Sequence, residues 1–318
     1  MVVLAVLILA SACDRADATR GRPNREVAND TVDSMGVVPS QLRIVALHGP
    51  PALVENSAAA MSETQPGVLF SINDSGNDAL LFAVDTLGAD RGVWRVTNAK
   101  NVDWESAALG PCGDSGARAR CVYIGDTGDN TSRHPTRTIY RVAEPTASGK
   151  RSRVRAEALI YRYADGPHDV EAMYVPANGD VVLITKRPLR DATRRLRPAL
   201  VFRLPRSAWN DAAVAVAQLV DSVPIVPGSA PLRLVTDASL APDGRHLAVR
   251  TYTQVYIVAT DPVSGAVNHA VAASVCNVTS LGEPQGEGVT WGDSSGRLVF
   301  TSEGANQPLR LATCPVPK

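Results

Sequence analysis

The stretch Asp103-Trp104-Glu105-Ser106-Ala107 decides the fold, because it opens a unit that the chain repeats. Each copy begins with acidic or polar residues, continues with small and apolar ones, and passes through a turn into an apolar run. The other openings are Val54-Glu55-Asn56-Ser57-Ala58, Asp169-Val170-Glu171-Ala172-Met173, Thr236-Asp237-Ala238-Ser239-Leu240 and Gly286-Glu287-Gly288-Val289-Thr290. A unit of several short strands that recurs along a chain is typical of a β-propeller.

Strand-like runs fill the rest of each unit, and turn residues separate them. The second runs are VLFSIND, VYIGD, VVLITK, HLAVRT and LVFTSE. The last unit lacks a fourth run, whereas residues 42–48 (LRIVALH) precede the first unit without another partner. We expect this N-terminal strand to complete the last blade, since closure removes exposed sheet edges. The sequence therefore predicts an all-β, five-bladed β-propeller of four-stranded antiparallel blades over residues 42–318, with a six-bladed ring as the alternative.

An apolar segment at the start of the chain predicts export. Residues 1–12 (MVVLAVLILASA) end in small residues directly before Cys13. This pattern resembles a bacterial lipoprotein signal peptide, although no basic residue precedes the apolar run. The run is too short to span a bilayer. We expect cleavage after residue 12, acylation of Cys13, and a polar tether over residues 13–41 that attaches the propeller to a lipid bilayer. This places the protein in the bacterial cell envelope, periplasmic or at the cell surface; plain secretion is the alternative.

The cysteine count agrees with export. The chain has five cysteines, and four remain if Cys13 carries lipid. Cys112 and Cys121 flank a short loop and can pair, which leaves Cys276 and Cys314 for a second bridge. Disulfides persist outside the cytoplasm, and free buried thiols are the alternative.

Composition and missing motifs exclude several functions. The 318 residues carry 32 basic and 32 acidic side chains, so no net charge favours nucleic acid as a partner. The 45% hydrophobic content is that of a folded protein. The sequence contains no HExxH or P-loop motif, which argues against a zinc protease and a nucleoside triphosphatase of these types, and no Ser/His/Asp set is marked by its spacing, which argues against a covalent serine esterase. We expect a monomer.

The repeat also predicts a ring of acidic residues. The first strand of a propeller blade lines the central channel, so the five openings converge on the axis. The expected ring is Ser57, Glu105, Glu171, Asp237 and Glu287. Carboxylates this close repel one another, and a bound cation relieves the repulsion. Oxygen ligands without His or Cys suit Ca²⁺ or another hard divalent cation. The alternative is structural: the carboxylates accept hydrogen bonds from backbone N–H groups of the next blade.

The ring resembles that of the five-bladed calcium-activated nucleotidases, or apyrases. There a Ser, three Glu and a further Ser surround a central Ca²⁺. Ser57, Glu105, Glu171 and Glu287 match this pattern, and Asp237 stands in place of the second Ser. The nucleotide-binding residues of the family are not recognised, so the resemblance implies no nucleotidase activity. The stretches INDSGND, YIGDTGDN and GEGVTW also resemble bacterial exported propellers named after phytase-like esterases, which implies fold and export only.

Further candidate residues lie at the same end of the channel: some end the second strands, and His168 directly precedes the third opening. Asp126 or His168 could act as a general base, Lys186 or Arg250 could bind an anionic substrate, and Asp74 is a further candidate substrate-binding residue. The alternatives are turn residues for the acids, a loop position for the histidine, and ion pairs for the cations. Two functions are therefore expected. One is a metal-dependent hydrolase of phosphoesters, and the other is a non-catalytic platform that binds a small-molecule, protein or glycan ligand at the channel mouth.

Overall fold

The computed structural model describes residues 36–113, 119–186, 193, 198–223, 225 and 234–318. The expected signal peptide, the acylated Cys13 and most of the tether lie outside the described residues. Contacts divide the chain into residues 1–33 and residues 34–318. The second unit contains all of the described residues.

This unit is built from β-strands, with short 3-10 turns at η1 (Arg206–Asn210) and η3 (Thr279–Leu281). One sheet has the order β2 (Asn56–Met61), β3 (Val68–Asn73), β4 (Leu80–Asp85), β5 (Asp90–Thr97) and β9 (Arg151–Arg155). A second has the order β15 (Val235–Leu240), β16 (His246–Thr251), β17 (Gln254–Ala259) and β18 (Ser274–Asn277). A third has the order β19 (Gly286–Trp291), β20 (Arg297–Ser302), β21 (Leu309–Thr313) and β1 (Ser40–Val45).

The remaining sheet has eight strands and contains two four-stranded runs. The first run is β6 (Trp104–Pro111), β7 (Arg120–Asp126), β8 (Arg137–Ala143) and β10 (Glu157–Tyr163). The second is β11 (Val170–Tyr174), β12 (Val181–Thr185), β13 (Ala199–Leu204) and β14 (Ala215–Val223). A parallel pairing of β10 with β14 joins the two runs at their outer strands.

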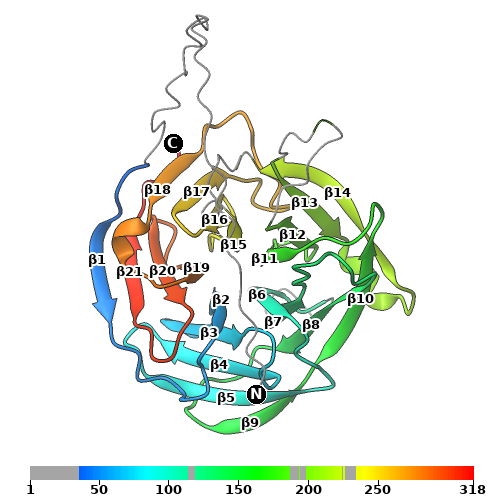
Figure 1. Cartoon of the computed structure of the whole chain (residues 1–318), viewed down its shortest axis with the longest axis horizontal. Coiled ribbons are helices and arrows are strands. Elements are labelled where there is room, and N and C mark those ends of the chain that lie inside the picture. The colour runs from blue at the N-terminus through cyan, green and yellow to red at the C-terminus, as the bar shows by residue number, and fades with distance from the viewer. Residues whose placement is uncertain (1–35, 114–118, 187–192, 194–197, 224, 226–233) are drawn as a thin grey trace, which may run out of the picture. The chain divides into compact units, whose positions relative to one another are not determined.

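The inner strands of these runs form a closed ring. β2, β6, β11, β15 and β19 contact one another in that cyclic order, and β19 returns to β2. Figure 1 shows these strands nearest the centre, with the later strands of each sheet further out. The unit is therefore a β-propeller, as the repeat predicts. β1 pairs antiparallel with β21, so the N-terminal strand completes the last sheet as expected.

One strand was not expected. β9 (RSRVR) pairs in parallel with the outer strand β5 and extends that sheet. Its four other residues are polar or charged and exposed, and only Val154 between them is apolar. Such a strand lacks the alternation of apolar and polar residues by which a half-buried strand is detected in a sequence.

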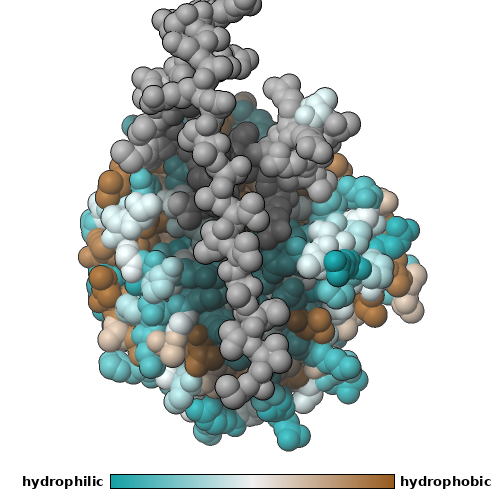
Figure 2. Space-filling model, viewed as in Figure 1, coloured by the Kyte–Doolittle hydropathy of each residue, from teal (hydrophilic) through white to brown (hydrophobic). Residues whose placement is uncertain are grey.

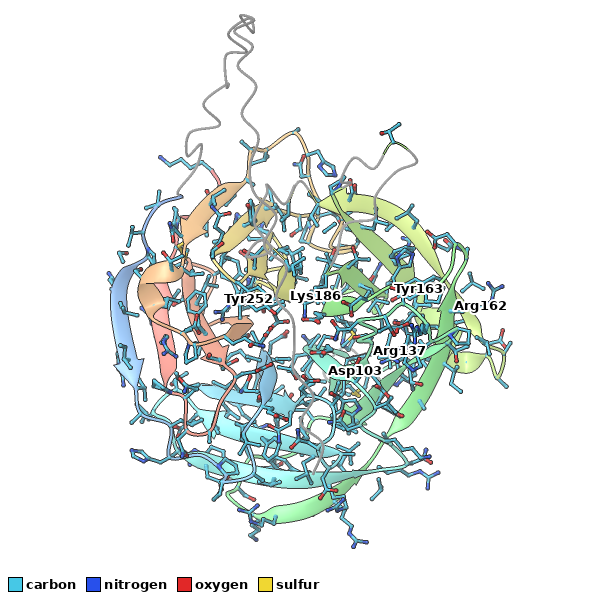
Figure 3. All side chains as sticks on the ribbon, viewed as in Figure 1. Asp103, Arg137, Arg162, Tyr163, Lys186 and Tyr252 are labelled. Carbon is cyan, nitrogen blue, oxygen red and sulfur yellow. A yellow bond between two sulfur atoms is a disulfide. The ribbon has the colours of Figure 1, made fainter. Side chains whose placement is uncertain are left out.

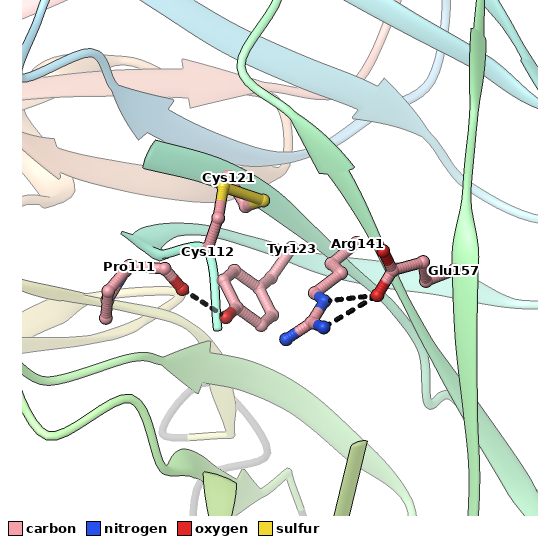
Figure 4. The surroundings of a disulfide bond; sticks show 6 residues. All are labelled: Pro111, Cys112, Cys121, Tyr123, Arg141 and Glu157. Atoms are coloured by element: carbon pink, nitrogen blue, oxygen red, sulfur yellow. Dashed lines mark hydrogen bonds and ion pairs between the residues drawn. A yellow bond between two sulfur atoms is a disulfide. The ribbon is translucent and has the colours of Figure 1, made fainter. Parts of the chain in front are cut away.

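Both expected disulfides are present. Cys112–Cys121 joins the end of β6 to the start of β7, and Figure 4 shows its surroundings. The Tyr123 hydroxyl beside it donates to the carbonyl of Pro111 at 2.6 Å. Cys276–Cys314 connects β18 with the residue after β21, and so links two sheets. The bridges indicate an oxidising environment, outside the cytoplasm. Within the described residues, no helix has both the length and the apolar character that a membrane span requires.

Candidate metal centre

Every inner strand carries a β-bulge near its first residue. In β2, Asn56 pairs with Asn73 and Ala58 with Ile72, so Ser57 is the extra residue. The registers of β6, β11 and β15 leave out Glu105, Glu171 and Thr236 in the same way, and that of β19 leaves out Glu287 together with Gly288 opposite the single residue Thr301. A bulge turns a side chain out of the regular alternation of a strand. These five equivalent residues therefore share one position at the end of the ring where the inner strands begin.

The register corrects the expected alignment of the fourth unit by one residue. Thr236, and not Asp237, occupies the position equivalent to Ser57 and Glu105. Thr236 Oγ1 donates to the carbonyl of Glu287 at 3.1 Å, and Ser57 Oγ donates to that of Trp104 at 2.9 Å. The ring thus holds two hydroxyl residues and three glutamates.

Asp237 has a structural role between the inner strands. Its side chain is fully buried, and its carboxylate accepts backbone N–H groups of Val289 at 2.9 Å, Ala238 at 2.8 Å and Ala59 at 3.5 Å. These donors lie on β19, β15 and β2, so Asp237 connects three inner strands. This is the structural role that the sequence analysis gives as the alternative.

The three ring glutamates are buried close together. Glu105, Glu171 and Glu287 are 7%, 1% and 4% exposed. Burial raises the pKa of Glu105, and the negative charges of Glu171, Asp74 and Asp103 raise it further. Burial also raises the pKa of Glu171, although the neighbouring Lys186 ammonium opposes this. A buried acidic group of this kind takes up protons or binds a cation.

A second acidic group lies beside the ring. Asp74, Asp103 and Glu105 each offer a carboxylate oxygen, and these oxygens lie within 4.8 Å of one another. Burial, followed by the charge of Asp74, raises the pKa of Asp103. No described residue donates a hydrogen bond to the Glu105 carboxylate. Because all the candidate ligand atoms are carboxylate oxygens, these three residues fit a hard divalent cation.

The sequence predicts these three residues only in part. The repeat predicts Glu105 as a metal ligand and Asp74 as a substrate-binding residue, and it predicts no role for Asp103. Asp103 lies two positions before Glu105, a spacing that places both side chains on the same side of an extended chain. That spacing is the signal that could have identified Asp103.

Lys186 is the basic residue that lies next to the ring glutamates. It follows β12, and its ammonium pairs with Oε1 of Glu171. Burial lowers the pKa of Lys186, but the charge of Glu171 outweighs this and raises it above the ordinary value. Figure 3 shows Lys186 and Tyr252 together near the centre. Burial, followed by the charge of Glu287, raises the pKa of the half-buried Tyr252, which the sequence analysis did not single out.

The two expected bases have protein partners. Asp126 accepts the backbone N–H of Asp103 at 2.8 Å and the Arg137 guanidinium at 3.3 Å. His168 lies 3.0 Å from Asp165, and its ring packs against those of Tyr163 and Phe202. Both are 4% exposed, so neither faces an open site in this structure.

Arg250 is fully buried between β16, β19 and β20. Its guanidinium donates to the carbonyls of Gly288 and Thr301 and pairs with Glu283. The guanidinium of Arg250 is therefore not available for the expected role of binding an anionic substrate. Instead, Arg250 links the sheet that contains β16 to the sheet that contains β19 and β20.

A cavity in the described part of the chain lies at the other end of the ring. It has a volume of about 850 Å³ and is lined by the last residues of the inner strands, including Ala60, Ala108, Ala238, Thr290 and Trp291. None of the acidic residues above lines it. Figure 2 shows hydrophilic residues on both sides of the central part of one face.

No protein-family model matches the chain, and neither does any curated protein. Among solved structures, a gluconolactonase from Xanthomonas campestris gives a TM-score of 0.44 at 16% identity, over 88% of this chain and 82% of that chain. A glutaminyl cyclase from Myxococcus xanthus gives 0.45 at 11% identity, over 86% and 95%. A luciferin-regenerating enzyme gives 0.42 at 8% identity, over 87% and 82%. No activity is transferred from likenesses this distant.

Without divalent ions, stability is expected to fall as the pH rises from 5 towards 8. Burial raises the pKa of Glu287 from 4.5 to about 7. Between these two pH values, the folded protein therefore keeps a proton on Glu287 that the unfolded chain releases. This stabilisation is complete below the unfolded pKa, is lost as the pH passes the folded pKa, and amounts to about 3 kcal/mol. Melting temperatures across this range should decline less steeply for Glu287→Gln, which cannot ionise. Equal slopes for variant and wild type would contradict the assignment.

Proposed function

We propose that the chain is an exported β-propeller that binds a hard divalent cation, Ca²⁺, on Asp74, Asp103 and Glu105. The observation that carries the proposal is Glu105. Glu105 is 7% exposed, its carboxylate has no hydrogen-bond donor among the described residues, and one of its oxygens lies within 4.8 Å of two further carboxylates. Carboxylates this close repel one another, and a bound cation relieves the repulsion.

The proposal extends to architecture and location. The closed order of inner strands and the five bulges support five blades, with β1 in the last. The disulfides support a location outside the cytoplasm. Acylated Cys13 would then attach a monomeric propeller to the bilayer.

The proposed reaction is metal-dependent hydrolysis of a phosphoester. When bound, a hard cation supplies a Lewis acid for a phosphoryl oxygen. The residues of this chain prepare the site. Asp126 holds the backbone N–H of Asp103 and so positions that ligand. His168, packed in the core, fixes the segment that leads into Glu171. Arg250 and Lys186 are paired with carboxylates, and the proposal gives neither a substrate contact.

A second candidate function is ligand binding without catalysis. The cavity of about 850 Å³ at the opposite end of the ring supports it, because cavities of this size accommodate small organic molecules. Small residues on the inner strands form much of its wall, with Met61, Tyr174 and Trp291 among them.

Thermal unfolding tests the cation site. Protein treated with EDTA is expected to melt higher by about 5 °C when Ca²⁺ is added at a hundredfold excess over its dissociation constant, because a ligand of the folded state stabilises it by mass action. An Asp103→Asn/Glu105→Gln variant should lose the rise, and Glu157→Gln, an exposed acid, should keep it. If metal-free protein shows no shift with Ca²⁺, Mg²⁺ or Mn²⁺, the proposal is wrong. A shift justifies a screen of phosphoester substrates.

A further inference from the structure

The end of the ring where the inner strands begin offers oxygen ligands on all sides. Glu105, Glu171 and Glu287 point there from three inner strands, and the hydroxyls of Ser57 and Thr236 complete the set. Each hydroxyl donates its proton to a backbone carbonyl, so its lone pairs stay available. This donor set fits a hard cation on the axis.

The side chain of Lys186 also lies at this end of the ring. The side chain of Lys186 is 11% exposed and reaches the ring from the end of β12. Its ammonium pairs with Glu171, whose side chain is 2% exposed. Its charge also acts on Glu105, Glu287 and Glu303. Because its ammonium pairs with Glu171 of the inner strand β11 and Figure 3 shows Lys186 near the centre of the ring, this charge lies near the axis.

We infer that Lys186 is the axial cation of this propeller. Its tethered ammonium takes the place of a divalent ion among Glu105, Glu171 and Glu287, and confines metal binding to the off-axis group of Asp74, Asp103 and Glu105. The off-axis half of this inference rests on the proposed function, and the axial half does not.

Charge explains why the two cations exclude each other. A divalent ion on the axis would share Glu171 with the ammonium of Lys186, and like charges at contact distance inside a protein repel strongly. An ammonium attached to the chain is also present at an effective concentration that a free ion does not reach. The ammonium of Lys186 therefore occupies the axial position in place of a metal ion, also when Ca²⁺ is present.

Replacing Lys186 should open an axial metal site. In Lys186→Gln, three buried carboxylates lose their counter-ion, and a divalent cation can take its position. The variant is expected to be less stable than the wild type in EDTA and to recover in Ca²⁺ by more than the wild type gains. A residue that serves only to pack the channel would give the loss without the extra calcium-dependent recovery.

Calorimetric titration of the whole purified protein with Ca²⁺ tests the inference. We expect one ion for the wild type and two for Lys186→Gln. Lys150→Gln, which removes an exposed lysine, should bind as the wild type does. Lys186→Gln/Glu171→Gln removes both members of the ion pair, and should fold in EDTA without gaining the second ion.

The outcomes separate the two proposals. If the wild type binds no ion and Lys186→Gln binds one, the off-axis site is wrong and the axial inference stands. If both proteins bind the same number of ions, the axial inference is wrong. It is equally wrong if Lys186→Gln does not fold in Ca²⁺, because the inference requires the metal to replace the ammonium.

Discussion

An Arg250→Met variant is expected to lose about 3–5 kcal/mol of unfolding free energy, because it breaks a buried ion pair by removing one partner. Arg250 is fully buried on β16 and pairs with Glu283, whose side chain is 5% exposed. It also donates to the carbonyls of Gly288 at 2.6 Å and Thr301 at 3.1 Å. Methionine fills part of the volume, but it leaves an unpaired buried carboxylate and two carbonyls without this donor. Chemical denaturation measures the loss.

Two comparisons make the result specific to the buried charge. Arg297→Met removes an arginine whose side chain is 57% exposed and 3.5 Å from Asp293, and should change stability by less than about 0.5 kcal/mol. Arg250→Met/Glu283→Gln removes both charges, and should be more stable than Arg250→Met alone. If the double variant is the less stable one, the unpaired carboxylate is not the source of the loss.

The sequence predicted the arrangement of the strands because apolar runs and turns repeat along the chain. Residues 42–48 had no partner within their own unit, and this was enough to predict the pairing of β1 with β21. β9 escaped detection because its arginines surround a single apolar residue, Val154. Its position depends on pairing with β5, a contact between distant segments that no local pattern encodes.

The candidate site shows where residue type stops being informative. Asp237 and Glu105 are both acids at the opening of a unit, so the sequence placed both in the ring. The bulge in β15 falls on Thr236, and this turns Asp237 between the strands, where it accepts backbone N–H groups. Glu105 is itself the bulged residue and has no such donor. A shift of one residue exchanges the two sides of a strand, and only the pairing reveals it.

Removing the disulfide between Cys276 and Cys314 is expected to cost about 4 kcal/mol. The bridge closes a loop of 38 residues, and constraint of the unfolded chain stabilises the folded state by an amount that grows with loop length. Both cysteines are 1% exposed, so alanine is the suitable replacement, because serine would add buried hydroxyl groups. Urea denaturation of Cys276→Ala/Cys314→Ala gives the loss, and a larger m value is expected because the unfolded chain expands.

The second disulfide provides the internal comparison. Cys112 and Cys121 are nine positions apart in the sequence, so the same relation gives about 2.5 kcal/mol for Cys112→Ala/Cys121→Ala. The order of the two losses is the decisive result. Cys112–Cys121 joins neighbouring strands that are already paired, whereas Cys276–Cys314 links the sheet of β15–β18 to the sheet that β1 completes. Equal losses, or a larger one for the short loop, would mean that loop length does not govern the stabilisation and that local packing around Tyr123 does.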